Sequence, residues 1–334
     1  MSLLPCGEGP LFTDPSSDKA RAFFRKKPRG LFSKVMSVRD AVSRFVKDGD
    51  YLGSGGFGAN RIATAVMHEI LRQKKRDLGF AGHTTTHDFQ ILAAGNLGGE
   101  RLLARVDAAY IVGLEARGLS PQARRVMQSG EVEVCEWSNY ALACRLRAAA
   151  AGVPFFPARN MMGTDTFKHS AAKEIACPFT GERLAALPAL YPDVSAIHVH
   201  EADAYGNCRI RGITIADLEL ARASKRLIVT CERLVNNDEI RSAPHLTVIP
   251  SFSVDAVCEV PYGSYPGNMP GEYFSDEDHL RQWLNVETDE EAHRQFLDKH
   301  IYGVKDFEAY LRLCGGLERI KELRAQELLL PREA

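Results

Sequence analysis

The feature that most constrains the fold is a cluster of glycines between a short apolar stretch and a helical pattern. Residues 53–58 read Gly-Ser-Gly-Gly-Phe-Gly, and Tyr51 and Leu52 precede them. Apolar residues then recur at helical spacing, at Ile62, Ala63, Val66, Met67, Ile70 and Leu71. The sequence therefore predicts a strand, a glycine-rich turn and a helix in direct succession.

A turn of this kind is suited to a negatively charged group. Glycine allows positive φ and lets a ligand approach the backbone closely, and the following helix directs unpaired N–H groups to the same place. A phosphate, a carboxylate or the oxyanion of an acyl-transfer intermediate would fit. Gly55, Gly56 and Phe57 are therefore candidate oxyanion residues, and a tight turn between packed elements is the alternative. The glycine order differs from the dinucleotide fingerprint, and Arg61 does not match the lysine of a P-loop.

Three further segments repeat the order of short apolar strand, polar loop and helix. Strands are expected at residues 78–81, 106–112 and 132–135, followed by loops at 83–88, 113–121 and 136–139. This alternation predicts an α/β fold with an open, mostly parallel sheet and helices on both faces. Ligands bind beyond the carboxyl ends of the strands in such sheets, so these loops and the glycine loop should share one edge. Their candidate substrate-binding residues are His83, Glu115, Ser120 and Asn139.

The chain divides into three regions. Residues 1–35 are expected to wrap the domain surface or to be partly disordered. Residues 36–315 should form the α/β domain, and residues 316–334 a helical tail. From Asp276 onward, charged helical patterns are expected to cover one face of the sheet or to form an interface.

The middle of the chain interrupts the regular alternation. Residues 164–186 read as an irregular excursion, after which the sheet should resume with strands at 185–189 and 194–199. The turn at residues 203–207 predicts a hairpin, so the sheet should gain an antiparallel element there.

Composition excludes several classes of function. Lysine and arginine number 42 against 43 aspartates and glutamates, which gives no electrostatic basis for binding nucleic acid or an anionic membrane. No apolar run approaches the roughly 18 residues of a membrane span, and the N-terminus lacks a secretory pattern. The eight cysteines form no C-x-x-C pair, which indicates reduced, mostly buried thiols in a cytoplasmic protein.

Other catalytic or metal patterns are weak. Residues 198–201 read His-Val-His-Glu, and in a strand both imidazoles share a face and could hold one ion. No second cluster has metal-ligand spacing, so no metal is predicted. No Gly-x-Ser-x-Gly elbow of a serine hydrolase occurs. Glu115, Glu136 and Glu232 each follow an apolar strand, where a carboxylate could act as base or nucleophile, although capping or a salt bridge is the commoner role.

Four stretches together resemble one known family. They are residues 36–41 (Met-Ser-Val-Arg-Asp-Ala) with Asp48-Gly49-Asp50, Gly55-Gly56-Phe57-Gly58, Thr230-Cys231-Glu232 with Asp238-Glu239-Ile240-Arg241, and residues 254–257 (Val-Asp-Ala-Val) with Pro261-Tyr262-Gly263. Over about residues 36–315 the chain is similar to the A-type (alpha) subunit of family I CoA-transferases, and it resembles the glutaconate CoA-transferase type most.

The resemblance implies that CoA moves between carboxylic acids through an acyl-enzyme anhydride and then a glutamyl-CoA thioester. CoA is a substrate in this chemistry, and no metal or organic cofactor is implied. The family's nucleophilic glutamate lies on a B-type (beta) subunit in a Ser-Glu-Asn-Gly-like setting, and no such motif occurs in this chain. The resemblance therefore implies a heteromeric CoA-transferase in which a B-type partner completes the active site around an acyl-CoA and a carboxylic acid.

Three alternatives stay open. One group with the same fold hydrolyses a carbon–carbon bond in a cyclic ketone CoA ester from steroid ring degradation, with a glutamate in the segment that matches residues 136–139. Asn139 takes that glutamate's place here and cannot act as a base, but Glu136 lies three residues away and would be catalytic in a hydrolase. Another group decarboxylates glutaconyl-CoA-type substrates. A chain without catalysis would be a CoA-ester-binding regulatory subunit.

Overall fold

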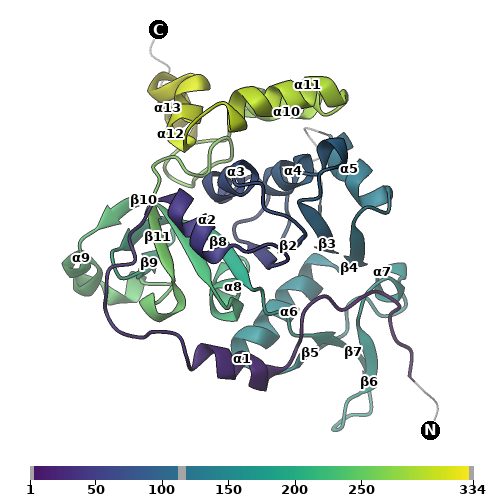
Figure 1. Ribbon diagram of the computed structural model, residues 1–334. Helices are drawn as coiled ribbons and strands as arrows, with labels where there is room; N and C mark the ends of the chain where they lie inside the picture. The colour runs from purple at the N-terminus through teal and green to yellow at the C-terminus, as the bar shows by residue number, and fades with distance from the viewer. Residues whose placement is uncertain (1–3, 112–117, 331–334) are drawn as a thin grey trace.

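An open, mostly parallel sheet forms the centre of the computed structural model, which describes residues 4–111 and 118–330 (Figure 1). In these residues the sheet has eight strands in the order β11-β10-β8-β1-β2-β3-β4, with β9 antiparallel to β8 and all other pairs parallel. The strands are β1 Tyr51–Ser54, β2 Leu78–Gly82, β3 Leu103–Ala108, β4 Glu133–Glu136, β8 Val194–Asp203, β9 Cys208–Arg209, β10 Leu227–Val235 and β11 Ala256–Glu259. The predicted fold class and the predicted hairpin are confirmed.

Helices cover both faces of this sheet. One face carries α2 (Val38–Phe45), α3 (Thr64–Arg72), α4 (His87–Ala94) and α5 (Pro121–Gln128), which lie side by side. The other face carries α6 (Asn139–Ala151) and α8 (Asp217–Ala223), which pack together. Because the strands are buried on both faces, they read as short apolar runs in the sequence.

The strand order reverses between β1 and β8. From β1 the chain winds through β2, β3 and β4 in one direction, whereas β8, β10 and β11 extend in the other. The connections that leave the carboxyl ends of β1 and β8 lead to helices on opposite faces, α3 and α8. Such a divergence opens the crevice in which doubly wound proteins bind their ligands. The glycine loop 53–58 leaves β1 at this point.

The third strand differs from its prediction. A strand was expected at residues 106–112, but β3 begins at Leu103 and ends at Ala108, and residue 112 lies outside the described residues. The prediction begins too late because the charged Arg105 interrupts the apolar pattern. Asp107, which the prediction does include, is buried within the strand. Arg145 Nη1 pairs with its Oδ1 at 2.7 Å, and the indole N–H of Trp137 donates to the same oxygen at 2.6 Å. These partners compensate the buried charge, so a strand continues through an aspartate.

The segment after α6 also differs from its prediction. Residues 164–186 are not irregular, and the strand expected at 185–189 does not belong to the main sheet. β5 (Phe155–Ala158), β6 (Lys173–Ala176) and β7 (Arg183–Pro188) form a separate antiparallel sheet in the order β5-β7-β6. The Pro-Phe-Thr-Gly stretch is the turn of the β6–β7 hairpin, closed by a 2.7 Å bond from Cys177 N–H to the Glu182 carbonyl.

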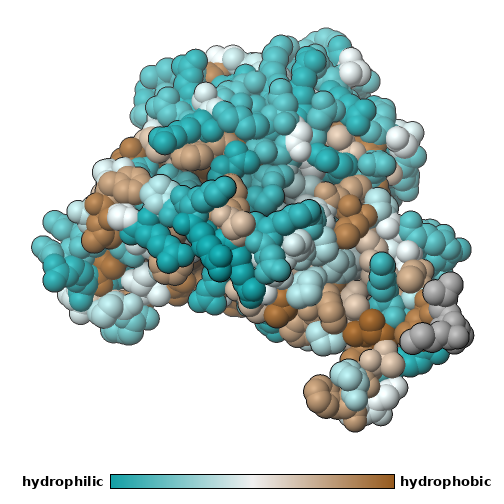
Figure 2. Space-filling view, turned by 60° about the horizontal axis from the view of Figure 1, so that its bottom comes forward, coloured by the Kyte–Doolittle hydropathy of each residue, from teal (hydrophilic) through white to brown (hydrophobic). Residues whose placement is uncertain are grey.

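The small sheet carries exposed hydrophobic side chains. Phe155 on β5 is 40% exposed and Phe179 in the hairpin turn is 93% exposed. Figure 2 shows hydrophobic surface gathered at the lower right, around this projecting part of the molecule. Short α7 (Asp165–Lys168) connects β5 to β6.

The described part of the N-terminal extension, residues 4–35, runs along the domain surface (Figure 1). The Gly7 N–H donates to the Ala172 carbonyl at 2.8 Å, so the chain adds to the edge beside β6. A Cβ at Gly7 would lie 2.0 Å from the Ser170 carbonyl oxygen, so only glycine permits this approach. The extension then forms α1 (Ser17–Phe24), and Lys27 pairs with Asp255 at 2.7 Å.

The C-terminal part is helical, as predicted. It comprises α10 (Glu277–Val286), α11 (Glu290–Leu297), α12 (Phe307–Leu313) and α13 (Gly316–Glu327), and Figure 1 shows these helices above α3, α4 and α5. Ile320 and Leu323 of α13 are buried in one cluster with Tyr265 and Tyr310, so the last helix packs on the α/β domain.

Two further sequence expectations concern cysteines and membranes. All eight cysteines are free, and Cys135, Cys144, Cys208, Cys231 and Cys258 are buried, which confirms mostly buried, unpaired thiols. Among the helices that the structure describes, none combines the length and the apolar character needed to cross a membrane.

Candidate active site

The glycine loop has a conformation that requires glycine. Gly56 has a φ of +77°, and a Cβ there would lie 2.5 Å from the Asn60 carbonyl oxygen. The N–H groups of the loop are all held inside the protein: Gly55 donates to Ala196 O (2.9 Å), Gly56 to Asp217 Oδ1 (2.7 Å), Phe57 to Asn60 O (3.0 Å) and Gly58 to Thr84 O (2.6 Å). In this conformation residues 55–58 offer no free N–H. The oxyanion role of Gly55, Gly56 and Phe57 stays a prediction, and it requires one of these bonds to be exchanged or shared.

Backbone hydrogen bonds join the predicted loops along the edge. The Gly58 N–H reaches the loop after β2, the Thr85 N–H donates to the Tyr110 carbonyl at 2.8 Å, and the Trp137 N–H donates to the Ala108 carbonyl at 2.7 Å. Each loop leaves the carboxyl end of a parallel strand, so the prediction of a common edge is confirmed for the described residues. Glu115 and residues 113–117 lie outside the described residues.

His83 and Ser120 differ in their accessibility. His83 is half-buried in the loop after β2, and burial lowers the pKa of its imidazole, which favours the neutral ring. Ser120 is fully buried. Its hydroxyl caps α5 by accepting the Ala123 N–H at 3.0 Å and donates to Glu287 Oε2 at 2.6 Å. A substrate role for Ser120 would require this contact with Glu287 to open.

Glu136 and Asn139 lie at the end of β4. The Glu136 side chain is exposed, and Asn139 is half-buried at the start of α6. The Oδ1 atom of Asn139 is buried but accepts no hydrogen bond from the described residues. Both side chains are therefore at the predicted edge, and their roles stay predictions.

The sequence patterns gave no functional signal for Asp217, which lies directly behind the glycine loop. Asp217 begins α8, and its carboxylate pairs with Arg61 at 2.8 Å (Oδ2 to Nη2) with both side chains fully buried. In sequence, Asp217 looks like an ordinary first-turn helix residue. In the sequence, Arg61 was noted only because it differs from the lysine of a P-loop. In the structure, its φ of +56° is unusual for a residue with a side chain.

Residues 198–201 do not form a metal site. His198 bonds to Thr230 Oγ1 through Nδ1 (2.8 Å) and to Glu232 Oε1 through Nε2 (2.7 Å). His200 Nε2 donates to the Pro270 carbonyl at 2.9 Å. In the described part of the chain, no group of three or more His, Cys, Asp or Glu side chains could hold a metal ion.

Thr230, His198 and Glu232 have the order of a nucleophile, base and acid, but their burial indicates a structural role. Thr230 and His198 are 0% exposed and Glu232 is 7% exposed, so a substrate carbonyl has no access to the hydroxyl. Burial would raise the pKa of Glu232, but hydrogen bonds from His198, the Tyr262 N–H and the Tyr273 hydroxyl outweigh it and lower the pKa. The network joins the middle of β8 to the middle of β10 and to the loop at Tyr262.

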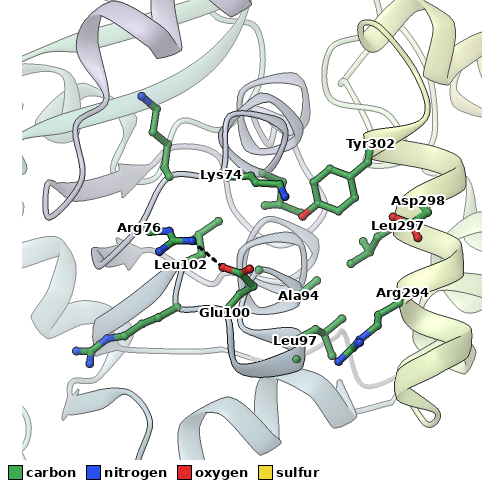
Figure 3. A pocket seen from close by; sticks show the side chains of 15 residues that line it. Lys74, Arg76, Ala94, Leu97, Glu100, Leu102, Arg294, Leu297, Asp298 and Tyr302 are labelled. Carbon is green, nitrogen blue, oxygen red and sulfur yellow. Dashed lines mark hydrogen bonds and ion pairs between the residues drawn. The ribbon is translucent and has the colours of Figure 1, made fainter.

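Two cavities lie away from the glycine loop. One of about 460 Å³ is at the opposite edge of the sheet, where the connections before β2 and β3 face α11. Figure 3 shows Lys74 and Tyr302 extending into it, with Arg76 paired to Glu100 at 3.2 Å. The other, of about 840 Å³, lies between α2, α3, the end of β11 and α12–α13. Neither cavity is lined by the predicted site residues.

Fold and edge together define a doubly wound α/β protein, and the glycine loop lies at the strand-order reversal where such proteins bind their ligands. The sequence profile of the coenzyme A transferase family matches residues 35–260, which span β1 to β11. The chain belongs to the coenzyme A transferase family.

Its relatives include two curated proteins with CoA-transferase names. The chain is 36% identical over 282 residues to the A-type subunit of 3-oxoadipate CoA-transferase from Pseudomonas knackmussii, covering 83% of this chain and 97% of that one. It is 31% identical to the A-type subunit of glutaconate CoA-transferase from Acidaminococcus fermentans over 86% of this chain and 94% of that one. The crystal structure of the latter enzyme superposes with a TM-score of 0.82, at 30% identity, over 87% of this chain and 95% of that chain.

Two further relatives carry names with other chemistries. The IpdA component of the cholesterol ring-cleaving hydrolase of Rhodococcus jostii is 29% identical over 82% of this chain and 93% of its own length. The crystal structure of a decarboxylase, AibA/AibB, superposes with a TM-score of 0.69, at 31% identity, over 80% of this chain and 98% of that chain.

Proposed function

We propose that this chain is the A-type subunit of a heteromeric CoA-transferase that moves CoA from an acyl-CoA to a carboxylic acid. The observation that carries the proposal is the likeness to glutaconate CoA-transferase, which holds in sequence and structure over most of both chains. The strand-order reversal supports it, because it places the glycine loop at the crevice where a ligand is expected.

The nucleophile would come from a B-type partner seated at the carboxyl edge of the sheet, with its glutamate facing Gly55, Gly56 and Phe57. Its carboxylate attacks the acyl-CoA carbonyl, forming an acyl-glutamyl anhydride and releasing the CoA thiolate. The thiolate then attacks the glutamyl carbonyl, which gives the glutamyl-CoA thioester and frees the first acid. A second acid reverses both steps. The first acyl-CoA and the second acid are the only reactants, the first acid and the new acyl-CoA are the products, and no oxidant or reductant is needed.

This chain would supply the surroundings of the reacting carbonyl. The absence of side chains at Gly55 and Gly56 lets the loop backbone pack closely against Asp217 and the Asn60 carbonyl, which would fix the loop beside the partner's carboxylate. His83 is half-buried in the adjoining loop, and burial lowers the pKa of its imidazole and so favours the neutral ring, which can donate one hydrogen bond to a substrate oxygen without adding charge. Asn139 would orient the substrate by hydrogen bonds.

Hydrolysis of a carbon–carbon bond is the second candidate, because Glu136 is exposed at the same edge. Hydrolysis needs a base to move protons, whereas transfer needs a nucleophilic carboxylate and positioned donors. Asn139 is an amide at the position of the hydrolase glutamate, so transfer is favoured. Decarboxylation of a glutaconyl-CoA-type substrate is supported only by the AibA/AibB likeness.

The test begins with the tagged chain isolated from the cells in which it naturally occurs, with its partner identified by mass spectrometry. We expect a B-type chain with a glutamate in a Ser-Glu-Asn-Gly-like setting. The complex should transfer CoA from acetyl-CoA or succinyl-CoA to glutaconate or 3-oxoadipate with ping-pong kinetics. Borohydride should trap a thioester on the partner's glutamate, and the isolated chain should be inactive.

Several outcomes would contradict transfer. Robust transfer by the isolated chain would refute a partner-borne nucleophile. A partner without the glutamate would favour a CoA-ester-binding regulatory subunit. Failure to trap a thioester, together with a Glu136→Gln variant that binds substrate but is inactive, would favour the hydrolase.

A further inference from the structure

A buried ion pair lies at the point where the strand order reverses. Arg61 lies in the connection from β1 to α3 on one face, and Asp217 begins α8 on the other face. Arg61 Nη2 and Asp217 Oδ2 are 2.8 Å apart, and both side chains are 0% exposed. The second oxygen of Asp217 accepts the Gly56 N–H at 2.7 Å. The pair therefore joins the glycine loop to the start of α8.

Arg61 is in turn held by three segments of the chain. Besides its bond to Asp217, its guanidinium donates to the Ile213 carbonyl at 2.5 Å, and its backbone N–H donates to the Asn268 carbonyl at 2.9 Å. These contacts fix a backbone conformation at φ +56°, which is strained for a residue with a side chain.

The arrangement is a poor one for stability alone. Nε and Nη1 of Arg61 are buried and have no hydrogen-bond partner among the described residues, and a buried donor without a partner destabilises the fold. Hydrophobic residues in place of a buried ion pair are often neutral or stabilising. Backbone strain and unpaired donors in one buried residue next to a glycine loop are typical of a functional constraint.

We propose that Asp217 and Arg61 are positioning residues for acyl transfer. Asp217 fixes the Gly56 amide, and with it the peptide planes of residues 55–57. Arg61 fixes Asp217 and neutralises its charge. The neutralisation matters because an uncompensated carboxylate behind the loop would oppose the negative charge that develops on the acyl oxygen. Neither side chain touches the substrate, and this role rests on the proposed CoA-transferase function.

Two double variants separate the pair's charge from its hydrogen bond to Gly56. Arg61→Met with Asp217→Asn removes both charges and keeps an oxygen that can accept the Gly56 N–H. Arg61→Met with Asp217→Leu removes both charges and the acceptor. Neither leaves an unpaired buried charge, so both should fold.

The chain offers a matched control at the other end of β1. Asp50 directly precedes this strand and pairs with Arg226 at 2.9 Å (Oδ1 to Nη2), with side chains 13% and 24% exposed. Arg226→Met with Asp50→Leu removes an ion pair of similar geometry at the edge opposite the glycine loop. Thermal unfolding of all three variants reports their stability separately.

The first readout is hydrogen–deuterium exchange of the isolated chain, followed on peptides that contain residues 53–58. Asp217→Leu in the double variant should accelerate exchange in this segment at least tenfold. The Asp217→Asn double variant and the control pair should exchange like the wild type. Wild-type exchange in the Asp217→Leu variant, or equal acceleration by the control pair, would overturn the proposal.

The second readout is turnover of the complex with the B-type partner, with acetyl-CoA and glutaconate as probes. The Asp217→Leu double variant should lower kcat by up to about 10²–10³, the loss typical of removing one oxyanion-hole donor, with KM for acetyl-CoA unchanged. The Asp217→Asn double variant should recover most of kcat. Faster exchange with unchanged kcat would make the pair purely structural and overturn the proposal. If the wild-type complex shows no transfer activity, the proposed function is refuted instead. Hydrogen–deuterium exchange would still test whether Asp217 fixes the Gly56 amide.

Discussion

Lowering the pH from 6.5 toward 4 should destabilise the protein through histidines buried under the C-terminal helices. His279 on α10 and His293 on α11 are 7% and 0% exposed. Burial lowers the pKa of each imidazole to about 4, with the nearby His300 adding to the effect at His279 and Arg125 adding to it at His293. Asp276 opposes the shift at His279 without cancelling it.

The sign follows from proton binding. Imidazoles in the unfolded chain take up a proton near pH 6.5, whereas these two do so in the folded chain only near pH 4. Between these values the unfolded state binds more protons, so stability is fully present above pH 6.5 and falls as the pH falls. A pKa difference of one corresponds to about 1.4 kcal/mol, so each group removes about 3 kcal/mol by pH 4. That is a large share of the about 5–15 kcal/mol by which domains are stable.

Urea unfolding at pH 7.5, 6.0 and 5.0, followed by tryptophan fluorescence, measures this dependence. Trp283 is a suitable probe because its ring lies 5.9 Å from the ring of His293. Neither ring nitrogen of His293 has a hydrogen-bond partner in the described residues. His293→Leu should therefore fold at pH 7.5 and lose about 3 kcal/mol less than the wild type on full acidification.

The exposed His245 provides the matched control, and His245→Leu should follow the wild type at every pH. If His293→Leu loses stability in parallel with the wild type between pH 7.5 and 5.0, buried imidazole is not the cause and the reasoning is refuted.

Two substitutions test other parts of the molecule. Gly56→Val should lower turnover of the complex at least about 100-fold, because Gly56 has a φ of +77° and a Cβ would meet the Asn60 carbonyl oxygen at 2.5 Å. Circular dichroism and co-purification would show that the variant is folded and bound to its partner. Near-normal turnover would mean that the loop is only a structural turn. Burial raises the pKa of Glu287 to about 7, so between pH 4.5 and 7 this carboxyl is protonated in the folded chain but ionised in the unfolded chain. The free energy of unfolding therefore falls as the pH rises through this range. Glu287→Gln should therefore raise the free energy of unfolding at pH 8 by about 1–3 kcal/mol and have little effect at pH 4.5; equal destabilisation at both pH values would contradict this.

The arrangement of the main sheet could be predicted because each of its strands and helices has a recognisable local sequence pattern. Parallel strands buried on both faces give short apolar runs such as residues 78–81, and the helices between them show their own spacing. Because the strands are parallel, their carboxyl ends lie at the same edge of the sheet, and so do the loops that follow them. β3 was predicted to begin too late because the charged Arg105 interrupts the apolar run, while the Gly49 and Asp77 carbonyls that its guanidinium contacts lie far away in the sequence.

The interior of the candidate site could not be predicted in the same way. Arg61 and Asp217 are 156 positions apart, and nothing near either residue indicates the other. The Gly55 and Gly56 amides likewise find their acceptors on β8 and α8. Local sequence shows that a glycine loop can bind an anion, but only the fold shows that its N–H groups already have partners. The function was inferred from the family resemblance rather than from the loop.

At the carboxyl edge of the sheet, the backbone positions of the loops are fixed, whereas the side chains that the loops carry can vary. Backbone hydrogen bonds connect the loops after β1, β2, β3 and β4 in series, and such bonds do not depend on side-chain identity. Side chains at the loop positions of His83, Glu136 and Asn139 can therefore change while the frame stays intact, which is how one fold supports different reactions. The named relatives include transferases, a hydrolase and a decarboxylase. Within this chain, the choice between CoA transfer and carbon–carbon hydrolysis should accordingly depend on Glu136 and Asn139 at the end of β4, and the Arg61–Asp217 pair should be needed in either case to hold the glycine loop.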